Sequence, residues 1–181
     1  MEKIKPSLNY CWHVVYVKSR AEKKAEIELR HKNIETYLPL QRKLRQWSDR
    51  KKWVEMPLIS GYLFVFVSRK EYDTVLQSNY VVSYVRFEGK SAIIPEKQIE
   101  SLKIMLRQEN LEIDVTPQKF EIGQRIEVIS GPLIGVTGKL INLKGKNKVA
   151  VILEQLGYSA VIEISTENLR VFESVKSEID N

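Results

Sequence analysis

The sequence predicts an α+β fold, in which an antiparallel-sheet sandwich with helices is followed by a small five-stranded β-barrel. Three observations support this prediction. The run from Met56 to Val67 reads as a strand with two unlike faces, and helical periodicity occurs on both sides of it. Five short strand patterns separated by glycine turns fill the last third of the chain, which is typical of a small barrel.

Composition is that of an ordinary globular protein of one or two domains, with 43% hydrophobic and 29% charged residues among 181. The longest apolar runs are far shorter than the ~20 residues that cross a bilayer, and the first ten residues lack the apolar core of a signal peptide. We therefore expect a cytoplasmic protein without a membrane partner. A single cysteine, Cys11, rules out an internal disulfide and a cysteine metal cluster, and we expect its role to be structural.

The positive charge lies in one block. The chain has a net charge of +6, and residues 18–52 contain 12 Lys/Arg against 5 Asp/Glu, a net +7. The remaining 17 basic and 18 acidic residues give a net −1. Such a block is the footprint of a polyanionic partner, although a solvated charged face is the commoner alternative.

The central stretch, MPLISGYLFVFV, is a turn followed by the most apolar run of the chain. After Gly61, the aromatic side chains of Tyr62, Phe64 and Phe66 alternate with aliphatic ones. Because successive strand residues point to opposite faces, one face of the strand is aromatic and the other is aliphatic. The aliphatic face requires helices to cover it, whereas the aromatic face is either covered or presented to a partner.

A strand and a helix are predicted before this stretch. Trp12 to Lys18 is apolar on both faces, as expected in the middle of a covered sheet. Ser19 and Glu22 have the spacing of a capping box, followed by a helix over Ala21 to Lys32 with Asn33 as its left-handed stop. The helix is amphipathic, with small residues facing the sheet and a basic stripe facing outward.

Residues 36 to 57 are predicted to form a long hairpin, interrupted early by Pro39. Its tip combines basic side chains with tryptophans, a combination that binds phosphates and stacks on unpaired bases. A solvated tip closed by two tryptophans is an equally good interpretation. The tip residues are Arg42, Lys43, Arg45, Arg50, Lys51 and Lys52, flanked by Trp47 and Trp53.

After the central strand we predict a short helix over Lys70 to Gln77, a strand over Val81 to Phe87 and a further strand that runs into Pro95. The next helix, Glu96 to Gln108, is expected to cover the aliphatic face of the sheet. The predicted organisation is a domain over residues 1–109, a linker at 110–119, a β-barrel domain at 120–173 and a polar tail at 174–181. The barrel strands are predicted at Gln124 to Ile129, Val136 to Leu143, Lys148 to Leu153, Tyr158 to Ser165, and Leu169 to Phe172.

Two parts of the chain resemble known motifs. Ile122 to Leu143, IGQRIEVISGPLIGVTGKLINL, resembles the KOW motif of SH3-like barrels, with its Gly-Pro turn and internal glycines. Trp12 to Lys18, Pro57 to Val65 and Val81 to Pro95 resemble the opening, central and final strands of the NGN domain of NusG-type transcription factors. Tyr-Val-Lys-Ser-Arg at residues 16–20, after the opening tryptophan, and Val-Arg-Phe at residues 85–87 of the late strand are similar to those of specialised paralogues of the RfaH and UpxY type.

The resemblance implies a transcription elongation factor, with no catalytic site and no cofactor, that binds RNA polymerase and suppresses pausing and termination. The specialised paralogues are operon-specific antiterminators, for example of surface-polysaccharide operons. In the family, the NGN sheet offers a hydrophobic depression to the clamp helices of the polymerase β′ subunit. For Tyr62 and Phe64 the alternative is packing under the short helix. The matching positions are Tyr16, Ile59, Tyr62, Phe64 and Phe87.

Contact with non-template DNA or nascent RNA is also implied, and the charge of the block is consistent with phosphate contact. Asn79 and Tyr80 stand where RfaH has threonine and arginine, which argues against base-specific readout but not against backbone contact. The candidate residues are Lys18, Arg20, Lys23, Lys24, His31, Arg42, Lys43 and Arg45.

In the family the KOW domain recruits either a ribosomal protein of the Nus complex or Rho. Leu133 and Ile134 match that contact, with capping of the barrel end as the alternative. The β-branched strands predict a stable barrel and no refolding into the helical hairpin known for RfaH. We expect a monomer that is not an enzyme, since no catalytic or metal-ligand constellation occurs at usable spacing. The rival interpretation is a KOW-containing RNA-binding protein associated with the ribosome or translation.

Overall fold

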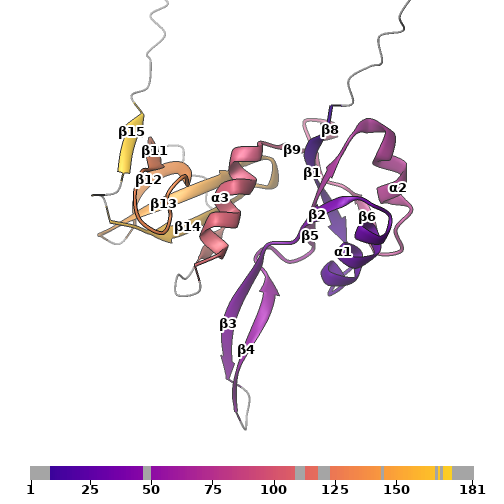
Figure 1. The fold of residues 1–181 in the computed structure, drawn as a ribbon, viewed down its shortest axis with the longest axis horizontal. Coiled ribbons are helices and arrows are strands. Elements are labelled where there is room, and N and C mark those ends of the chain that lie inside the picture. Colours follow the sequence, from indigo (N-terminus) through magenta and orange to yellow (C-terminus); the bar gives the residue numbers. More distant parts are fainter. Residues whose placement is uncertain are drawn as a thin grey trace, which may run out of the picture. The chain divides into compact units, whose positions relative to one another are not determined.

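The structure is a computed structural model, and it describes residues 9–46, 50–108, 113–117, 123–143, 145–165, 167 and 169–172. The chain divides into two compact units, one ending at Glu96 and the other beginning at Lys97. Both are built from antiparallel strands with associated helices, so the mixed α and β class that the sequence predicts is confirmed (Figure 1). The division falls before the helix that we expected to complete the first domain.

An antiparallel sheet lies at the centre of the first unit. Its strands lie in the order β2 (Glu35–Tyr37), β5 (Tyr62–Val67), β1 (Cys11–Val17) and β6 (Val81–Tyr84), and β9 (Ile93–Ile94) also pairs with β1. The central position of β1 explains why its sequence is apolar on both faces. Two further short strands, β7 (Arg86–Phe87) and β8 (Lys90–Ser91), form a small ribbon of their own.

Two helices cover the aliphatic face of this sheet, α1 (Glu22–His31) and α2 (Tyr72–Leu76), the latter preceded by the 3-10 turn η1 (Arg69–Glu71) (Figure 1). Leu29 of α1 and Val75 of α2 have no exposed surface and belong to one core with the strand residues Leu63 and Val65. The predicted alternation in the central strand therefore decides which face receives the helices.

The start of α1 differs from the prediction. Ala21 is the N-cap residue and makes no side-chain cap hydrogen bond, so the capping box expected from Ser19 and Glu22 is wrong. Glu22 is instead buried, and its Oε1 atom accepts the backbone N–H of Gly61 at 2.9 Å. The Glu22 side chain thus bonds to a residue distant in sequence rather than to the N-terminus of its own helix. Sequence spacing does not reveal such a long-range hydrogen bond. Asn33 has a φ of 58°, which confirms the predicted left-handed stop.

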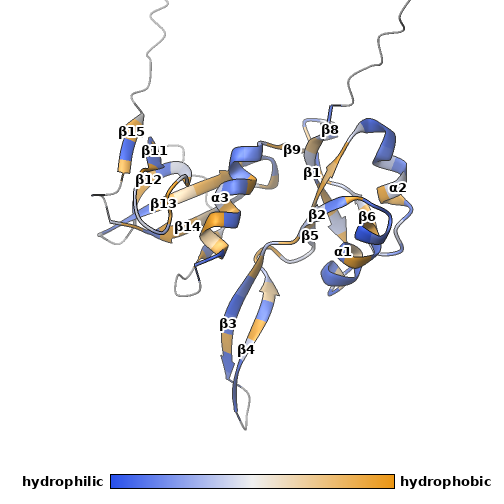
Figure 2. Ribbon diagram, viewed as in Figure 1, coloured by the Kyte–Doolittle hydropathy of each residue, from blue (hydrophilic) through white to orange (hydrophobic). Residues whose placement is uncertain are grey.

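The predicted hairpin is confirmed as a separate two-stranded ribbon. The chain leaves the sheet after β2, passes through the buried Pro39, and forms β3 (Leu40–Gln46), which pairs with β4 (Lys51–Pro57). The ribbon extends away from the sheet, and it is hydrophilic over most of its length with isolated hydrophobic residues (Figures 1 and 2). Trp47 lies outside the described residues.

The helix α3 (Glu96–Leu106) forms where it was predicted but does not belong to the first unit. Ser101 Oγ accepts the backbone N–H of Thr137 at 3.1 Å, and Gln108 Nε2 donates to the carbonyl of Pro132 at 2.9 Å. The expectation that this helix covers the aliphatic face is therefore wrong. Apolar periodicity shows that a helix buries one side, but it does not say which sheet receives that side.

The second unit contains α3 and a six-stranded antiparallel sheet. The strand order is β10 (Asp114–Thr116), β14 (Tyr158–Glu163), β13 (Lys146–Leu153), β12 (Thr137–Leu143), β11 (Gln124–Val128) and β15 (Leu169–Phe172). All five strands expected there are present, and β10 adds a sixth within the range expected to be a linker. The described pairing runs from β10 at one end to β15 at the other, and closure into a barrel is not seen in it. A 3-10 turn, η2 (Glu154–Leu156), precedes β14. The predicted polar tail, residues 174–181, lies outside the described residues.

Candidate functional site

The sheet of the first unit has an aromatic face, opposite the face that α1 and α2 cover. Directly opposed residues of two antiparallel strands lie on the same face. Since α2 packs with the aliphatic residues Leu63 and Val65, it lies on the other side of the sheet from Tyr62 and Phe64. The aromatic face consists of Trp12, Val14 and Tyr16 on β1, opposite Phe66, Phe64 and Tyr62 on β5.

Exposure differs sharply along this face. Tyr16 is 40% exposed and Tyr62 is half-buried, and their ring centroids are 4.9 Å apart. Phe64 has no exposed surface, and Ile59 is buried as well. Of these four predicted contact residues, the two tyrosines therefore offer surface to a partner, whereas Phe64 and Ile59 support the face from within.

The position of Tyr62 is set by the turn before it. Gly61 has a φ of +83°, a conformation that a residue without Cβ adopts at no steric cost. Its N–H donates to Glu22, and its carbonyl accepts the backbone N–H of Val17 at 2.9 Å. Helix, turn and central strand are thereby joined at one end of the aromatic face. Phe87 is 44% exposed, but it lies in the β7–β8 ribbon rather than on the β1–β5 pair.

The predicted nucleic-acid-binding residues form two groups that meet. One group lies at the end of β1 and on α1, and the other lies on β3. A salt bridge of 3.3 Å between Lys23 Nζ and Glu55 Oε2 joins α1 to β4 and so places the two groups side by side. All eight residues are exposed, namely Lys18, Arg20, Lys23, Lys24, His31, Arg42, Lys43 and Arg45.

The turn that contains Asn79 and Tyr80 is held beside the first of these groups. Lys18 N–H donates to the carbonyl of Tyr80 at 2.9 Å, and Glu28 of α1 accepts the N–H of Asn79 and the hydroxyl of Ser78. Burial alone would raise the pKa of Glu28, but hydrogen bonds including the one from Ser78 outweigh it, and the pKa is lowered. The carboxylate therefore stays charged and fixes this turn against the helix.

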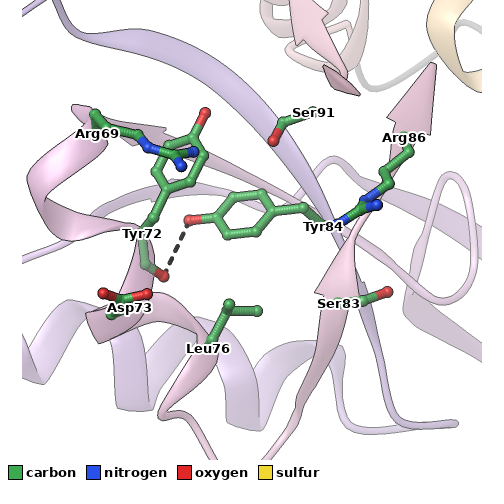
Figure 3. A pocket seen from close by; sticks show the side chains of 8 residues that line it. All are labelled: Arg69, Tyr72, Asp73, Leu76, Ser83, Tyr84, Arg86 and Ser91. Carbon is green, nitrogen blue, oxygen red and sulfur yellow. Dashed lines mark hydrogen bonds between the residues drawn. The ribbon is translucent and has the colours of Figure 1, made fainter. Parts of the chain in front are cut away.

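A polar pocket of about 300 Å³ opens between α2 and β6 (Figure 3). Arg69 lies over the Tyr72 ring at 4.9 Å, and the Tyr72 and Tyr84 rings stack at 4.6 Å. Burial raises the pKa of Tyr84, which keeps its hydroxyl protonated. Sequence reasoning missed this pocket, because no motif spacing marks its residues. They are Arg69, Tyr72, Asp73, Leu76, Ser83, Tyr84, Arg86 and Ser91.

His13, two residues after Cys11, is buried against Tyr72, a residue that lines this pocket. Its Nε2 atom lies 2.7 Å from the Tyr72 hydroxyl, and its Nδ1 atom lies 3.1 Å from the carbonyl of Ala92. A neutral ring satisfies both partners, since Nδ1–H donates to the carbonyl while Nε2 accepts from the hydroxyl. Burial lowers the pKa of His13 below its usual 6.5 despite the Ala92 hydrogen bond. His13 is therefore part of the interior, and Cys11 is a partly buried free thiol.

The turn between β11 and β12 carries the two residues expected to bind a partner of the second unit. Leu133 is buried, whereas Ile134 is 59% exposed, so Ile134 alone of the pair offers surface.

Among the described residues, no group of three or more His, Cys, Asp or Glu is placed to hold a metal ion. No helix within the described ranges is long and apolar enough to cross a membrane.

An antiparallel sheet covered by two helices, a basic ribbon and a second, strand-rich unit define an α+β protein whose exposed aromatic and basic surfaces suit binding. The family model described as transcription termination factor nusG matches residues 10–103. That range is more than half of the chain, and the chain therefore belongs to the NusG family and is a transcription factor. The resemblance of the first unit is thereby confirmed.

The comparison with solved structures finds similar chains, and the first of those described here supports this fold. A structure on the domain interaction in Thermotoga maritima NusG is 19% identical, with 91% of this chain and 98% of that chain covered and a TM-score of 0.51. A crystal structure of the MjSpt4:Spt5 complex, conformation A, is 15% identical over 89% of this chain and 97% of that chain, with a TM-score of 0.28. No curated protein sequence matches the chain.

Proposed function

We propose that the chain is a transcription elongation factor that binds RNA polymerase through its aromatic face and suppresses pausing and termination. We further propose that it is an operon-specific antiterminator of the RfaH and UpxY type. The observation that supports this most is the pair formed by Tyr16 and Tyr62, two neighbouring rings with exposed surface at a firmly held turn. Exposed aromatic residues clustered on a small domain usually mark a partner site.

The clamp helices of the polymerase β′ subunit are the proposed partner of this face. A helical tip that docks on a shallow aromatic surface gains apolar contact from the rings. Phe64 and Ile59 are buried and therefore offer no surface to the partner. Binding here holds the clamp closed, which is how pausing is suppressed.

The basic residues of α1 are proposed to contact the non-template DNA strand or nascent RNA. Lys18 and Lys24 are exposed on the unit that carries the aromatic face, and the salt bridge of Lys23 joins α1 to the ribbon. Their contribution is phosphate contact, which strengthens association without reading sequence. The DNA-binding role and the polymerase-binding role then belong to one unit.

The second unit is proposed to be a KOW-type barrel that recruits a ribosomal protein of the Nus complex, or Rho, through Ile134. The glycine turns and the strand order from β11 to β14 support this assignment. At Gly138 the neighbouring strand β13 approaches closely, because a Cβ atom at this position would lie 2.5 Å from the carbonyl oxygen of Ala150. The six paired strands also favour a β-rich unit that does not refold into a helical hairpin. We propose that the factor acts as a monomer.

The test is in vitro transcription with purified bacterial polymerase on two templates, one with the leader of the chain's own operon and one with an unrelated leader, each followed by a terminator. We expect read-through to rise on the first template only. Replacing Tyr16 and Tyr62 with alanine should abolish both read-through and association with polymerase. Leu76→Ala is the control, because Leu76 is 45% exposed on α2, on the opposite side of the sheet from the aromatic face. Wild-type protein that binds structured RNA but ignores polymerase would instead support the RNA-binding, ribosome-associated alternative.

A further inference from the structure

One face of the β3–β4 ribbon exposes an indole ring between two cations. Trp53 directly opposes Leu44, and the two side chains are 55% and 49% exposed. The Arg42 guanidinium lies 5.9 Å from the centroid of the Trp53 ring, and Lys51 shares the face because it is two residues away on the same strand. We call Arg42, Leu44, Lys51 and Trp53 the stacking face. A tryptophan with this exposure contributes little burial to the fold, and its ring is available to a second planar group.

The other face of the ribbon holds a pair of like charges. Arg45 directly opposes Lys52, and both side chains are exposed. Lys43 shares this face two residues nearer the sheet. We call Lys43, Arg45 and Lys52 the cationic face. Like charges directly opposed across a hairpin destabilise it, so folding gains nothing from this pair. A bound phosphate group would convert the repulsion into two attractive contacts.

The stacking face continues into α1. Glu55 directly opposes Arg42 on this face, and its carboxylate also forms the salt bridge with Lys23. The ribbon is therefore continuous with the basic helix rather than an isolated projection. A strand of nucleic acid bound along α1 would meet the indole ring next.

We propose that the β3–β4 ribbon binds single-stranded DNA, with one base stacked on Trp53 and the neighbouring phosphates held by Arg42, Lys51 and the cationic face. Stacking on a side chain requires a base that is not paired in a duplex, which selects a single strand. Leu44 lies beside the ring and offers an apolar contact to the thymine methyl group, which uracil lacks, and this favours DNA over RNA. The inference rests on the proposed function, in which the non-template strand is exposed, and it assigns the ribbon a ligand that binds without polymerase.

The test uses the full chain and a fluorescently labelled oligothymidylate of about 15 nucleotides, near the upper size of sites for single strands. Binding is followed by fluorescence anisotropy over a range of salt concentrations. Trp53→Ala should raise Kd by about 5- to 150-fold, the effect of losing one stacked base. The slope of log Kd against log salt should not change, because no charge is removed. Trp53→Phe keeps a stacking ring and should stay close to wild type.

A second pair of variants separates the cationic face from total charge. Replacing Arg45 and Lys52 with glutamine should lower the magnitude of the salt slope by about 1.4, since each phosphate contact on a single strand contributes about 0.7. The matched control replaces Lys70 and Lys90, two exposed lysines of the same unit outside the β3–β4 ribbon, with glutamine. Net charge falls equally in both, and only the ribbon variant should change the slope.

Three results would overturn the proposal. Trp53→Ala could bind with wild-type affinity, a duplex of the same length could bind as tightly as the single strand, or oligouridylate RNA could bind more tightly than oligothymidylate. Because no polymerase is present, these results are independent of the Tyr16 and Tyr62 variants. A protein that binds DNA but not polymerase would contradict the proposed function alone. A protein that binds polymerase but not DNA would contradict the proposed role of the ribbon alone.

Discussion

Replacing Phe64 with alanine should unfold the first unit far more readily than replacing its neighbour Tyr62. Phe64 is 0% exposed in the middle of β5, and its ring lies 6.1 Å from that of Tyr37. Removal of a fully buried phenylalanine side chain costs about 3–5 kcal/mol, because the transfer free energy is lost and a cavity remains. At about 4–8 °C per kcal/mol for a domain of 60–100 residues, the melting temperature should fall by at least about 12 °C. Tyr62 is half-buried, and its alanine variant should lose less than about 2 kcal/mol.

Urea titration followed by tryptophan fluorescence measures this difference. Trp47 and Trp53 are first replaced with phenylalanine, so that Trp12 alone reports. Trp12 is 4% exposed, and its ring packs 5.2 Å from Phe66 on the same face, so unfolding of the sheet exposes it to water. Phe64→Leu is the conservative control and should cost less than Phe64→Ala. A free energy of unfolding for Phe64→Ala within about 1 kcal/mol of wild type would refute the view that Phe64 supports the aromatic face from within.

Three further predictions concern single contacts. The pKa of His13 in the folded protein lies below the value of 6.5 in the unfolded chain, so the stability that the neutral ring contributes is present above pH 6.5 and is lost as the pH falls below 6.5. The urea midpoint of the wild type should therefore decline over this range. The midpoint of the control His31→Gln should decline equally, and that of His13→Gln should decline less. Glu22→Ala leaves the N–H of Gly61 without its acceptor and should cost about 1–3 kcal/mol, whereas Glu22→Gln, which keeps an acceptor, should cost less, as measured by the same titration. Gly138→Ala drives a methyl group against a backbone carbonyl of β13 and should lower the melting temperature of the second unit with a cost of about 1–3 kcal/mol; an unchanged calorimetric transition would contradict it.

Local patterns in the sequence predict the elements well but their partners less well. The alternation in the central strand predicts two unlike faces, and the structure places Leu63 and Val65 against the helices as expected. The same periodicity argument places α3 incorrectly, since an apolar stripe specifies burial without specifying the receiving sheet. The predicted capping box is wrong for a related reason, because the Glu22 carboxylate accepts a hydrogen bond from Gly61, which is distant in sequence.

In the candidate site, too, the sequence predicts which residues matter but not how they pack. Residue type and spacing single out Tyr16, Tyr62 and Phe64 together, but only the packed structure separates the exposed tyrosines from the buried phenylalanine. The pocket around Arg69 and Tyr84 has no sequence signal, because its lining residues are brought together by the approach of α2 to β6.

By itself, the sequence determined the α+β class, the five strands expected in the second unit, the two-faced central strand and the concentration of charge between residues 18 and 52. These follow from periodicity and composition, which depend on neighbours along the chain. Only the tertiary structure decided that α3 belongs with the second unit, that Phe64 is interior, and that Arg45 faces Lys52 across the ribbon. Burial and cross-strand register depend on which distant segments pack together, and that is a property of the folded chain as a whole.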